Sequence, residues 1–307
     1  MSEAPRGGVV IGRFMPPHAG HEYLIRFASG FTRDLTVFLC TLAHEPIPGE
    51  LRFAWMARLF PDVHLVHITE EIPNASRSSE GAHAIWARAI RERLDHDPRY
   101  VFASEEYGRD LAAALGAQFV PVDPQRDVFP ISAGMIRENP MAQWRYIPNV
   151  VRPYFARKVV LVQADDGLMR SLAAEYETHY ATDYPEYVTE LDLHGPVIES
   201  PVELARAQAA SESALLERVN RVLFTPVDPL LTLARAGRSQ DELADAATNL
   251  LADFPYLEPS LVVSTEELPA SYRAVAADHG WNVEICPDGE TAASTIRTRV
   301  DSWLTKT

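Results

Sequence analysis

Two histidines stand three residues apart at a predicted strand-to-helix turn near the start of the chain. Residues 12–21 have the sequence GRFMPPHAGH, after an apolar run at 9–11 and before an amphipathic stretch at 22–29. This pattern predicts a buried strand, a turn, and a helix that begins near His18 and His21. The N-terminus of a helix has free N–H groups and a partial positive charge that favour phosphate, and imidazoles there can donate hydrogen bonds to phosphoryl oxygens. We therefore predict a phosphate site, against the alternative of a loop whose histidines only cap the helix.

Strands and helices alternate along the first half of the sequence and determine where this turn must lie. Apolar runs predict strands over 36–40, 63–68, 100–103 and 119–122, and apolar spacing predicts helices over 50–60, 82–94 and 107–115. Continuous apolar strands are typical of a parallel sheet that helices cover on both faces. Ligands bind to such sheets beyond the carboxyl ends of the strands. We therefore expect His18, His21 and the loops at 45–52 and 104–108 to meet at that edge.

The composition indicates a globular protein of one large or two ordinary domains. The 307 residues are 47% apolar and 23% charged, and no stretch approaches the ~20 apolar residues of a membrane span. No secretion signal is recognisable, and Cys40 and Cys286 lie far apart without metal-ligand spacing, so we expect reduced thiols and a cytoplasmic location. The net charge is -15, with 25 acidic and 12 basic residues in the second half, which argues against a nucleic-acid partner. Without a long apolar stretch, we expect no membrane partner either.

A new strand pattern after residue 155 predicts a second α/β domain. Residues 158–162, 222–225 and 260–264 are apolar runs, and the segments between them are rich in Ala, Leu and Glu. We therefore predict two domains, residues 1–155 and 156–307.

The first segment resembles a known signature, and so does a second segment about one domain length further on. Residues 12–21 match Gly-x-Phe-x-Pro-x-His-x-Gly-His of the nucleotidyltransferase superfamily, and residues 131–137 (ISAGMIR) resemble its Ile-Ser-x-x-x-x-Arg. That superfamily joins a nucleoside triphosphate to a phosphate-bearing acceptor and releases pyrophosphate. Residues 45–52, 100–108 and 144–155 extend the likeness to the adenylyltransferase half of bifunctional nicotinamide-mononucleotide adenylyltransferase/ribosylnicotinamide kinases.

The resemblance implies a Rossmann-like domain that forms NAD and pyrophosphate from ATP and nicotinamide mononucleotide. The acceptor phosphate attacks the α-phosphorus directly, so positioning and charge stabilisation replace a protein nucleophile or a strong general base. Magnesium would be bound mainly through the triphosphate and water, so no metal ligands are assigned to the protein.

The resemblance also implies a role for each matching residue. The catalytic residues would be His21 on the α-phosphate, His18 on the triphosphate, and Arg137, whose planar fork pairs with phosphate oxygens. Further contacts to ATP or its phosphates would come from Gly12, Arg13, Phe14, Gly20, Ser132 and Ile136, and contacts to the acceptor from Arg52, Trp86, Glu105, Tyr107, Gly108 and Asp123.

Simpler readings of several of these acceptor residues stay open. Arg52 could be a solvated helix arginine, Trp86 a core residue, Tyr107 an ordinary helix start and Asp123 a turn residue. Gly134 stands where the superfamily often has a hydroxyl residue, a departure that could weaken phosphate binding.

In the bifunctional proteins a P-loop kinase domain follows directly, and the second half of this chain resembles one without its working parts. A P-loop needs glycines, a lysine and a Ser or Thr in set positions. Residues 163–170 (QADDGLMR) do not supply that pattern, and the only lysines of the sequence are Lys158 and Lys306. Carboxylates at 165 and 166 would repel phosphate.

Glu186 and Asp228 are what remains of the acidic motifs of such kinases. We therefore predict a kinase-like fold without kinase activity, with packing, oligomerisation or regulation as its role.

Two alternative functions stay open. The acceptor could be another phosphate compound, such as nicotinate mononucleotide or phosphopantetheine. Alternatively, Gly134 and the degenerate second domain could belong to a pyridine-nucleotide sensor that does not catalyse. Homo-oligomer formation is compatible with either.

Overall fold

The computed structural model describes residues 7–70, 82–163, 166–190 and 200–305. The chain divides into two compact units, residues 1–151 and 152–307, whereas the sequence analysis placed the boundary after residue 155. Each unit is built on one fully parallel sheet. The α/β architecture predicted from the apolar runs is confirmed in both.

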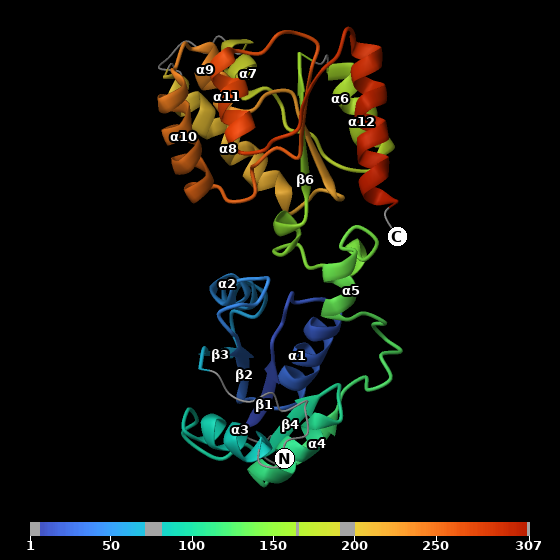
Figure 1. The fold of residues 1–307 in the computed structure, drawn as a ribbon. Helices are drawn as coiled ribbons and strands as arrows, with labels where there is room; N and C mark the ends of the chain where they lie inside the picture. Colours follow the sequence, from blue (N-terminus) through green and yellow to red (C-terminus); the bar gives the residue numbers. More distant parts are fainter. Residues whose placement is uncertain (1–6, 71–81, 164–165, 191–199, 306–307) are drawn as a thin grey trace. The chain divides into compact units, whose positions relative to one another are not determined.

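The sheet of the first unit has five strands in the order β3-β2-β1-β4-β5 (Figure 1). The strands are β1 (Gly8–Gly12), β2 (Leu35–Cys40), β3 (His64–Ile68), β4 (Tyr100–Ala103) and β5 (Gln118–Pro121). The helices are α1 (Ala19–Phe31), α2 (Gly49–Leu59), α3 (Ala82–Arg91), α4 (Tyr107–Leu115) and α5 (Ala133–Glu138), followed by the 3-10 turn η1 (Trp144–Tyr146). A second 3-10 turn, η2 (Arg152–Tyr154), begins the second unit.

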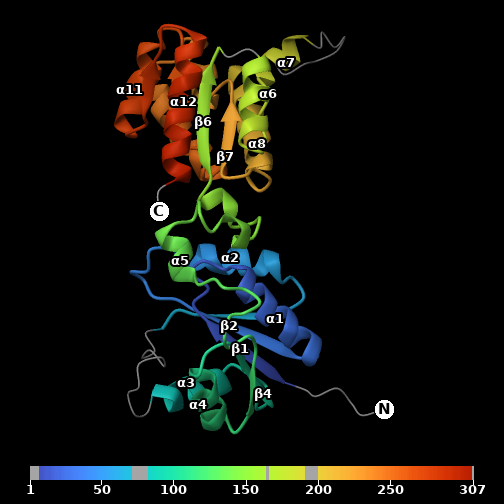
Figure 2. The same ribbon diagram turned by 90° about the vertical axis from the view of Figure 1, so that its right-hand side faces the viewer.

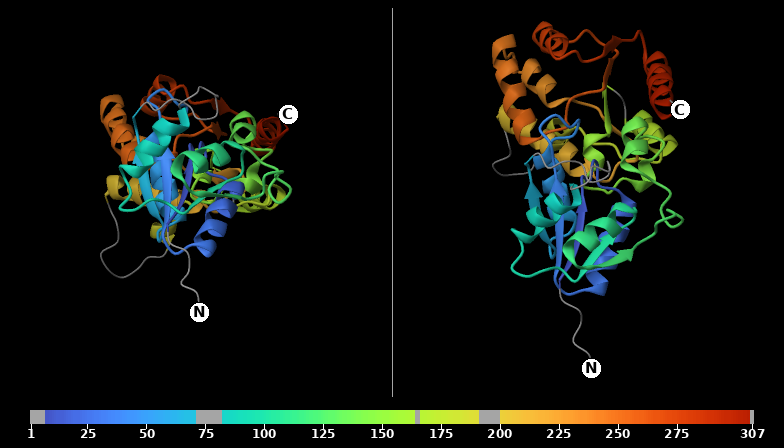
Figure 3. Two further views of the ribbon diagram at one scale, coloured as in Figure 1. Left: turned by 90° about the horizontal axis from the view of Figure 1, so that it is seen from below. Right: turned by 60° about the horizontal axis from the view of Figure 1, so that its bottom comes forward.

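Each face of this sheet packs on a different pair of helices, which is why its strands are apolar throughout. Val10, Val37 and Phe102 point to the face covered by α1 and α2. The residues between them along the strands, such as Val9 and Val101, point to the face covered by α3 and α4. In Figure 2, β1 and β2 lie between α1 and α2 above and α3 and α4 below, and Figure 3 gives two further views of this arrangement.

The strand order places a natural cleft beside β1. From β1 the chain moves to β2 and β3 on one side, and then returns to β4 on the other side of β1. The helix after β1 covers one face and the helix after β4 covers the opposite face. The two connecting loops therefore separate at the carboxyl edge of the sheet, which is where open α/β sheets bind their ligands.

The second unit has a four-stranded sheet in the order β7-β6-β8-β9. Its strands are β6 (Arg157–Val162), β7 (Val222–Thr225), β8 (Leu261–Ser264) and β9 (Val283–Ile285). Its helices are α6 (Asp166–Glu175), α7 (Tyr184–Glu190), α8 (Pro201–Leu216), α9 (Pro229–Arg235), α10 (Gln240–Asp253), α11 (Ala270–Asp278) and α12 (Gly289–Leu304). Helices α8 to α11 pack on one face and α6 and α12 on the other (Figure 1).

A cluster of charged and polar side chains is buried under α8 and α9. The ammonium group of Lys158 lies 2.6 Å from Glu212 Oε2 and donates a hydrogen bond to Asp228 Oδ2 at 2.9 Å. Gln208 and Thr225 donate to the second oxygen of Glu212, both at 2.9 Å. All five residues are at least 98% buried. The two carboxylates raise the pKa of Lys158 against the opposing effect of burial, so the lysine stays charged in the core.

Within the described residues, no helix is both long enough and apolar enough to cross a membrane.

We expect Lys158→Met to lower the free energy of unfolding of the second unit by about 3–5 kcal/mol, because two buried carboxylates lose their cation. Hydrogen exchange of the β6 amides in increasing urea would measure this unit separately. The control is Arg297→Met, since Arg297 pairs with Glu175 on the surface and such pairs contribute about 1 kcal/mol or less. If Lys158→Met is no more destabilising than the control, the buried cluster is not what stabilises this core.

Candidate active site

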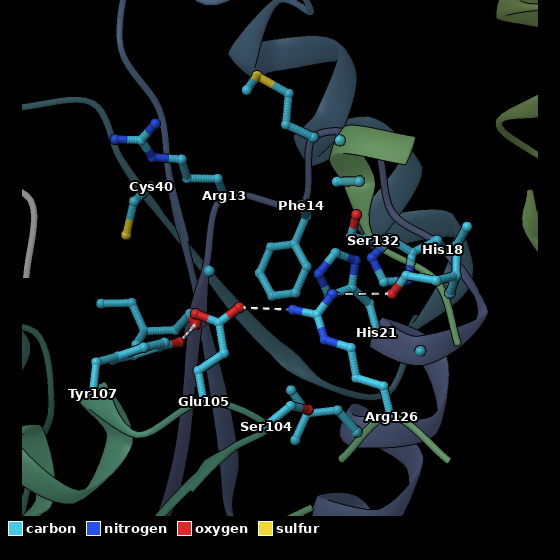
Figure 4. Close-up of a pocket in the computed structure, with 18 of the residues that line it drawn as sticks. Arg13, Phe14, His18, His21, Cys40, Ser104, Glu105, Tyr107, Arg126 and Ser132 are labelled. Carbon is cyan, nitrogen blue, oxygen red and sulfur yellow. Dashed lines mark hydrogen bonds and ion pairs between the residues drawn. The ribbon is translucent and has the colours of Figure 1, made fainter. Parts of the chain in front are cut away.

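A cavity of about 460 Å³ lies at the carboxyl edge of the first sheet (Figure 4). Its walls come from the β1–α1 turn, the loops that follow β2 and β4, and the segment that leads into α5. These are the loops that the strand order separates. Twelve of the predicted site residues line the cavity, namely Gly12, Arg13, Phe14, His18, Gly20, His21, Trp86, Glu105, Tyr107, Asp123, Ser132 and Arg137.

The two histidines lie against each other at the start of α1. His18 is the N-cap residue of the helix, yet its side chain makes no capping hydrogen bond. Its ring stacks on that of His21 with 3.7 Å between centroids, and Phe14 packs edge-on against His21 at 4.9 Å. A Cβ at Gly20 would come within 3.1 Å of the His18 ring, so the glycine leaves room for that ring. The helix-cap alternative therefore does not describe these histidines.

Both rings have a buried nitrogen without a protein partner. The Nδ1 atoms of His18 and His21 are buried and make no hydrogen bond within the described part of the chain. Burial, and secondarily the charge of Arg126, lowers the pKa of His18 to about 4. Burial, then His18 and Arg126, holds the pKa of His21 well below its usual range. Both rings are neutral near pH 7, and their free nitrogens can bond to a ligand in the cavity.

The two signature segments are bonded to each other. Ser132 is the N-cap of α5, where its Oγ accepts a hydrogen bond from the Met135 N–H at 3.3 Å. Arg137, on the same helix, donates to the carbonyl oxygen of Met15 in the β1–α1 turn. This bond holds the helix that carries Ser132 and Arg137 beside the turn that carries His18, so all three side chains face one cavity.

The carboxylates that line the cavity are engaged by other groups. Glu105 accepts a hydrogen bond from Arg126 at 2.9 Å, and Glu70 accepts two from Arg93 at 2.6 and 2.7 Å. Asp123 accepts hydrogen bonds from three backbone N–H groups of its own loop. No group of three or more potential metal ligands occurs among the described residues. Magnesium bound with a nucleotide stays a prediction.

Tyr107 and Trp86 each combine a structural role with a place in the cavity wall. The Tyr107 hydroxyl donates to the carbonyl oxygen of Ile11 at 2.8 Å, and burial raises its pKa far above the usual value, so it acts as an anchor for β1 and not as a general acid or base. Trp86 is only 7% exposed and packs in the core under α3, but it also lines the cavity. Both readings of Trp86 are therefore compatible with its position.

Arg52 does not line the cavity, and its surroundings point to a positioning role. The residue is fully buried at the start of α2. Its guanidinium donates to the carbonyl oxygens of Ile47 and Arg13 at 3.0 and 2.6 Å and pairs with Glu45. Glu45 in turn accepts a hydrogen bond from the Leu42 N–H at 3.0 Å. Arg52 thus joins the β2–α2 loop to the β1–α1 turn, and its predicted contact with substrate phosphate stays a prediction.

Gly108 and Ile136 also lie outside the cavity wall. A Cβ at Gly108 would come within 2.6 Å of both Ala103 and Phe119, so the glycine allows α4 to approach the sheet closely. Ile136 is fully buried and anchors α5 in the core. Their predicted ligand contacts are not visible in this geometry.

The sequence analysis missed Arg126 and Cys40, which both line the cavity. Arg126 lies between two predicted site residues, Asp123 and Ser132, in a segment without helix or strand periodicity; that position was the only available signal. Burial raises the pKa of the Cys40 thiol to about 12, so this thiol is protonated and unreactive near pH 7.

No family model matches the chain, but two curated relatives named trifunctional NAD biosynthesis/regulator protein NadR are similar to it. The Escherichia coli (strain K12) protein is 28% identical over 253 residues, 74% of this chain and 61% of the relative. The Salmonella typhimurium protein is 27% identical over 198 residues, 58% of this chain and 48% of the relative. The matches thus cover less than two thirds of the length of either relative.

Two solved structures have a similar fold. The crystal structure of NadR in complex with NAD and AMP-PNP gives a TM-score of 0.71 at 18% identity, covering 98% of this chain and 98% of the other. The chain is similar to NadR in sequence and in fold. NadR in complex with NR gives 0.69 at 17% identity, covering 98% of this chain and 96% of that one. The resemblance to the bifunctional type predicted from the motifs is therefore confirmed, and the NadR-like fold includes the second, kinase-like unit.

The lowered pKa of His18 predicts a pH-dependent stability. A histidine has a pKa of about 6.5 in an unfolded chain, whereas that of folded His18 is about 4. Between these values the unfolded chain binds a proton that the folded protein excludes, so the free energy of unfolding falls as the pH decreases. His18→Gln removes this titration. Between pH 7 and 4.5 its stability should rise relative to wild type by about 2–3 kcal/mol.

Denaturant titrations of both proteins at a series of pH values would measure this difference. The control is His64→Gln, because His64 is an exposed histidine at the opposite edge of the sheet. An equal shift in the control would contradict the assignment to burial at His18.

Proposed function

We propose that the first unit transfers the adenylyl group of Mg-ATP to nicotinamide mononucleotide, giving NAD and pyrophosphate. One observation carries the proposal. Two imidazoles with unpartnered buried nitrogens share a cavity with Ser132 and Arg137, which come from the other end of the unit. Neutral donors and a fixed cation on one wall suit a triphosphate, and the first unit contains no lysine that could serve instead.

The geometry supports catalysis by positioning. The phosphate of the acceptor attacks the α-phosphorus and pyrophosphate leaves, so the protein needs to align the reactants and stabilise the added negative charge. His21 would donate a hydrogen bond to the α-phosphate, with His18 and Arg137 on the leaving phosphates. Because the imidazoles are neutral and already buried, they can donate without reorganisation of water. Magnesium bound to ATP would neutralise part of the phosphate charge.

Nicotinamide mononucleotide is the proposed acceptor because of the resemblance and the relatives' part in NAD biosynthesis. A NadR structure holds NAD with AMP-PNP. In this chain Trp86 offers an aromatic wall for a nicotinamide ring. The cytoplasmic location stays a prediction.

We further propose that the second unit is not a kinase. Asp228, one of the two surviving acidic residues, is 2% exposed, and each of its oxygens accepts a hydrogen bond. One accepts from Lys158 at 2.9 Å and the other from the Leu230 N–H at 2.9 Å, which caps α9. Asp228 is therefore not available to a metal-bound nucleotide, and Lys158 lies within the sheet, away from any phosphate loop.

We expect the purified chain with Mg-ATP to form NAD and release pyrophosphate with nicotinamide mononucleotide, and to leave nicotinamide riboside unchanged. Parallel reactions with nicotinamide mononucleotide, its nicotinate analogue, phosphopantetheine and the riboside would be followed by pyrophosphate release and product mass. A faster reaction with another phosphate acceptor would show that this acceptor, and not nicotinamide mononucleotide, is the substrate. Phosphorylation of the riboside would refute the absence of kinase activity, and no reaction with any compound would refute the adenylyltransferase.

His21→Ala should lower the turnover number for NAD formation by about 100- to 1,000-fold, because one preorganised donor to the reacting phosphate is lost. Melting curves with and without ATP would show that the variant still folds and binds. The exposed His64→Ala is the matched control and should retain wild-type turnover. If His21→Ala is as active as the control, the proposed site is wrong.

A further inference from the structure

Arg126 extends into the cavity from the loop between β5 and α5, outside both signature segments. Its guanidinium donates to Glu105 Oε1 at 2.9 Å and to the carbonyl oxygen of Ile131 at 3.3 Å. Figure 4 shows this side chain directed toward Glu105 and the two histidines. Burial is the main cause of the lowered pKa values of His18 and His21, and the charge of Arg126 lowers both further. Arg126 is therefore close to the place proposed for the phosphates.

The loop that carries Arg126 has an unusual backbone that is fixed by Asp123. Asp123 and Arg126 have φ angles of 47° and 56°, in the left-handed region that residues with a side chain seldom adopt. The Asp123 carboxylate accepts hydrogen bonds at 2.9, 3.2 and 3.2 Å from the N–H groups of residues 127–129. Its carbonyl oxygen accepts another from the Arg126 N–H at 3.0 Å. Such strain persists where surrounding bonds over-determine it, and it is concentrated at functional sites.

Arg126 is one of the permanent positive charges of the described cavity wall. Because the two histidines are neutral, the permanent positive charge of the described cavity wall comes from Arg13, Arg126 and Arg137. Glu105, the partner of Arg126, is 55% exposed, and Arg126 is 41% exposed. An ion pair this exposed is weak and exchanges readily. A triphosphate has more negative charge than one carboxylate and matches the guanidinium fork equally well.

We propose that Arg126 is a third cationic contact for the phosphates of ATP. Before ATP binds, Glu105 holds the Arg126 guanidinium in place, and the triphosphate then replaces the Glu105 carboxylate. The inference rests on the proposed function of the cavity as an ATP site. On this view Asp123, predicted to bind the acceptor, instead fixes the loop, and Glu105 competes with the nucleotide.

The test is direct binding to the intact chain, measured by calorimetry with Mg-ATP, AMP and nicotinamide mononucleotide. Arg126→Ala should weaken ATP binding by about 10- to 100-fold, since a charged hydrogen-bonding group is lost. The loss should be smaller for AMP and below twofold for the mononucleotide. Arg126→Lys should recover part of the affinity. Glu105→Gln should tighten ATP binding by about two- to fivefold, because a weak competing ion pair is removed.

The matched control is Arg33→Ala, since Arg33 is exposed in the turn after α1, at the opposite edge of the sheet. It should bind all three ligands like wild type. If Arg126→Ala binds ATP within twofold of wild type but melts at a lower temperature, the pair with Glu105 is only structural and the inference fails. A loss confined to the mononucleotide would place Arg126 on the acceptor and also overturn it.

These outcomes are separable from failure of the proposed function, because ATP binding does not require an acceptor. A wild-type chain that binds ATP without forming NAD would refute the adenylyltransferase, and the comparison with Arg126→Ala would still decide the role of Arg126. If wild type does not bind ATP, both proposals are wrong.

Discussion

The position of β1 at the centre of a parallel sheet determines most of what the first unit can do. The strand order reverses beside β1, so the loops after β1 and β4 leave toward opposite faces and cannot close over the gap between them. Residues separated by more than a hundred positions, such as Met15 and Arg137, then come into direct contact at that edge. The cavity between these loops follows from this topology. A sheet with another strand order would separate the same side chains.

The two units use buried charge in opposite ways. In the first unit, burial keeps His18 and His21 neutral and leaves their nitrogens available to a ligand. In the second unit, the cost of burying a charge is offset within the fold, since Lys158 is paired with both Glu212 and Asp228. Polar groups that are satisfied within the fold contribute to a unique packing but have no capacity left for a ligand. The first arrangement suits a binding site and the second suits a core. The motifs differ in the same way, because the first unit has both nucleotidyltransferase signatures whereas residues 163–170 of the second do not supply a P-loop.

Regular elements were predictable from the sequence because burial on both faces leaves an apolar run, as at β2 and β6, and the signature residues were predictable because their spacing is distinctive. Residues whose role depends on distant partners were not. The burial of Arg52 depends on a loop that wraps around its guanidinium, which helical spacing does not encode. Arg126 is placed by two left-handed backbone angles, and Lys158 by carboxylates that come from two other elements. Trp86 was ambiguous because it belongs to both the core and the cavity.

The anchors of the β1–α1 turn have one further consequence. Tyr107, Arg52 and Arg137 donate to the carbonyl oxygens of residues 11, 13 and 15. Residues 11, 13 and 15 themselves line the cavity. Every amino acid has that carbonyl oxygen, so mutations at these three positions can change the lining of the cavity while the hydrogen bonds that hold the turn remain. Over evolutionary time the selectivity of such a site can drift independently of its architecture. That separation allows one scaffold to give rise to paralogues with different ligands.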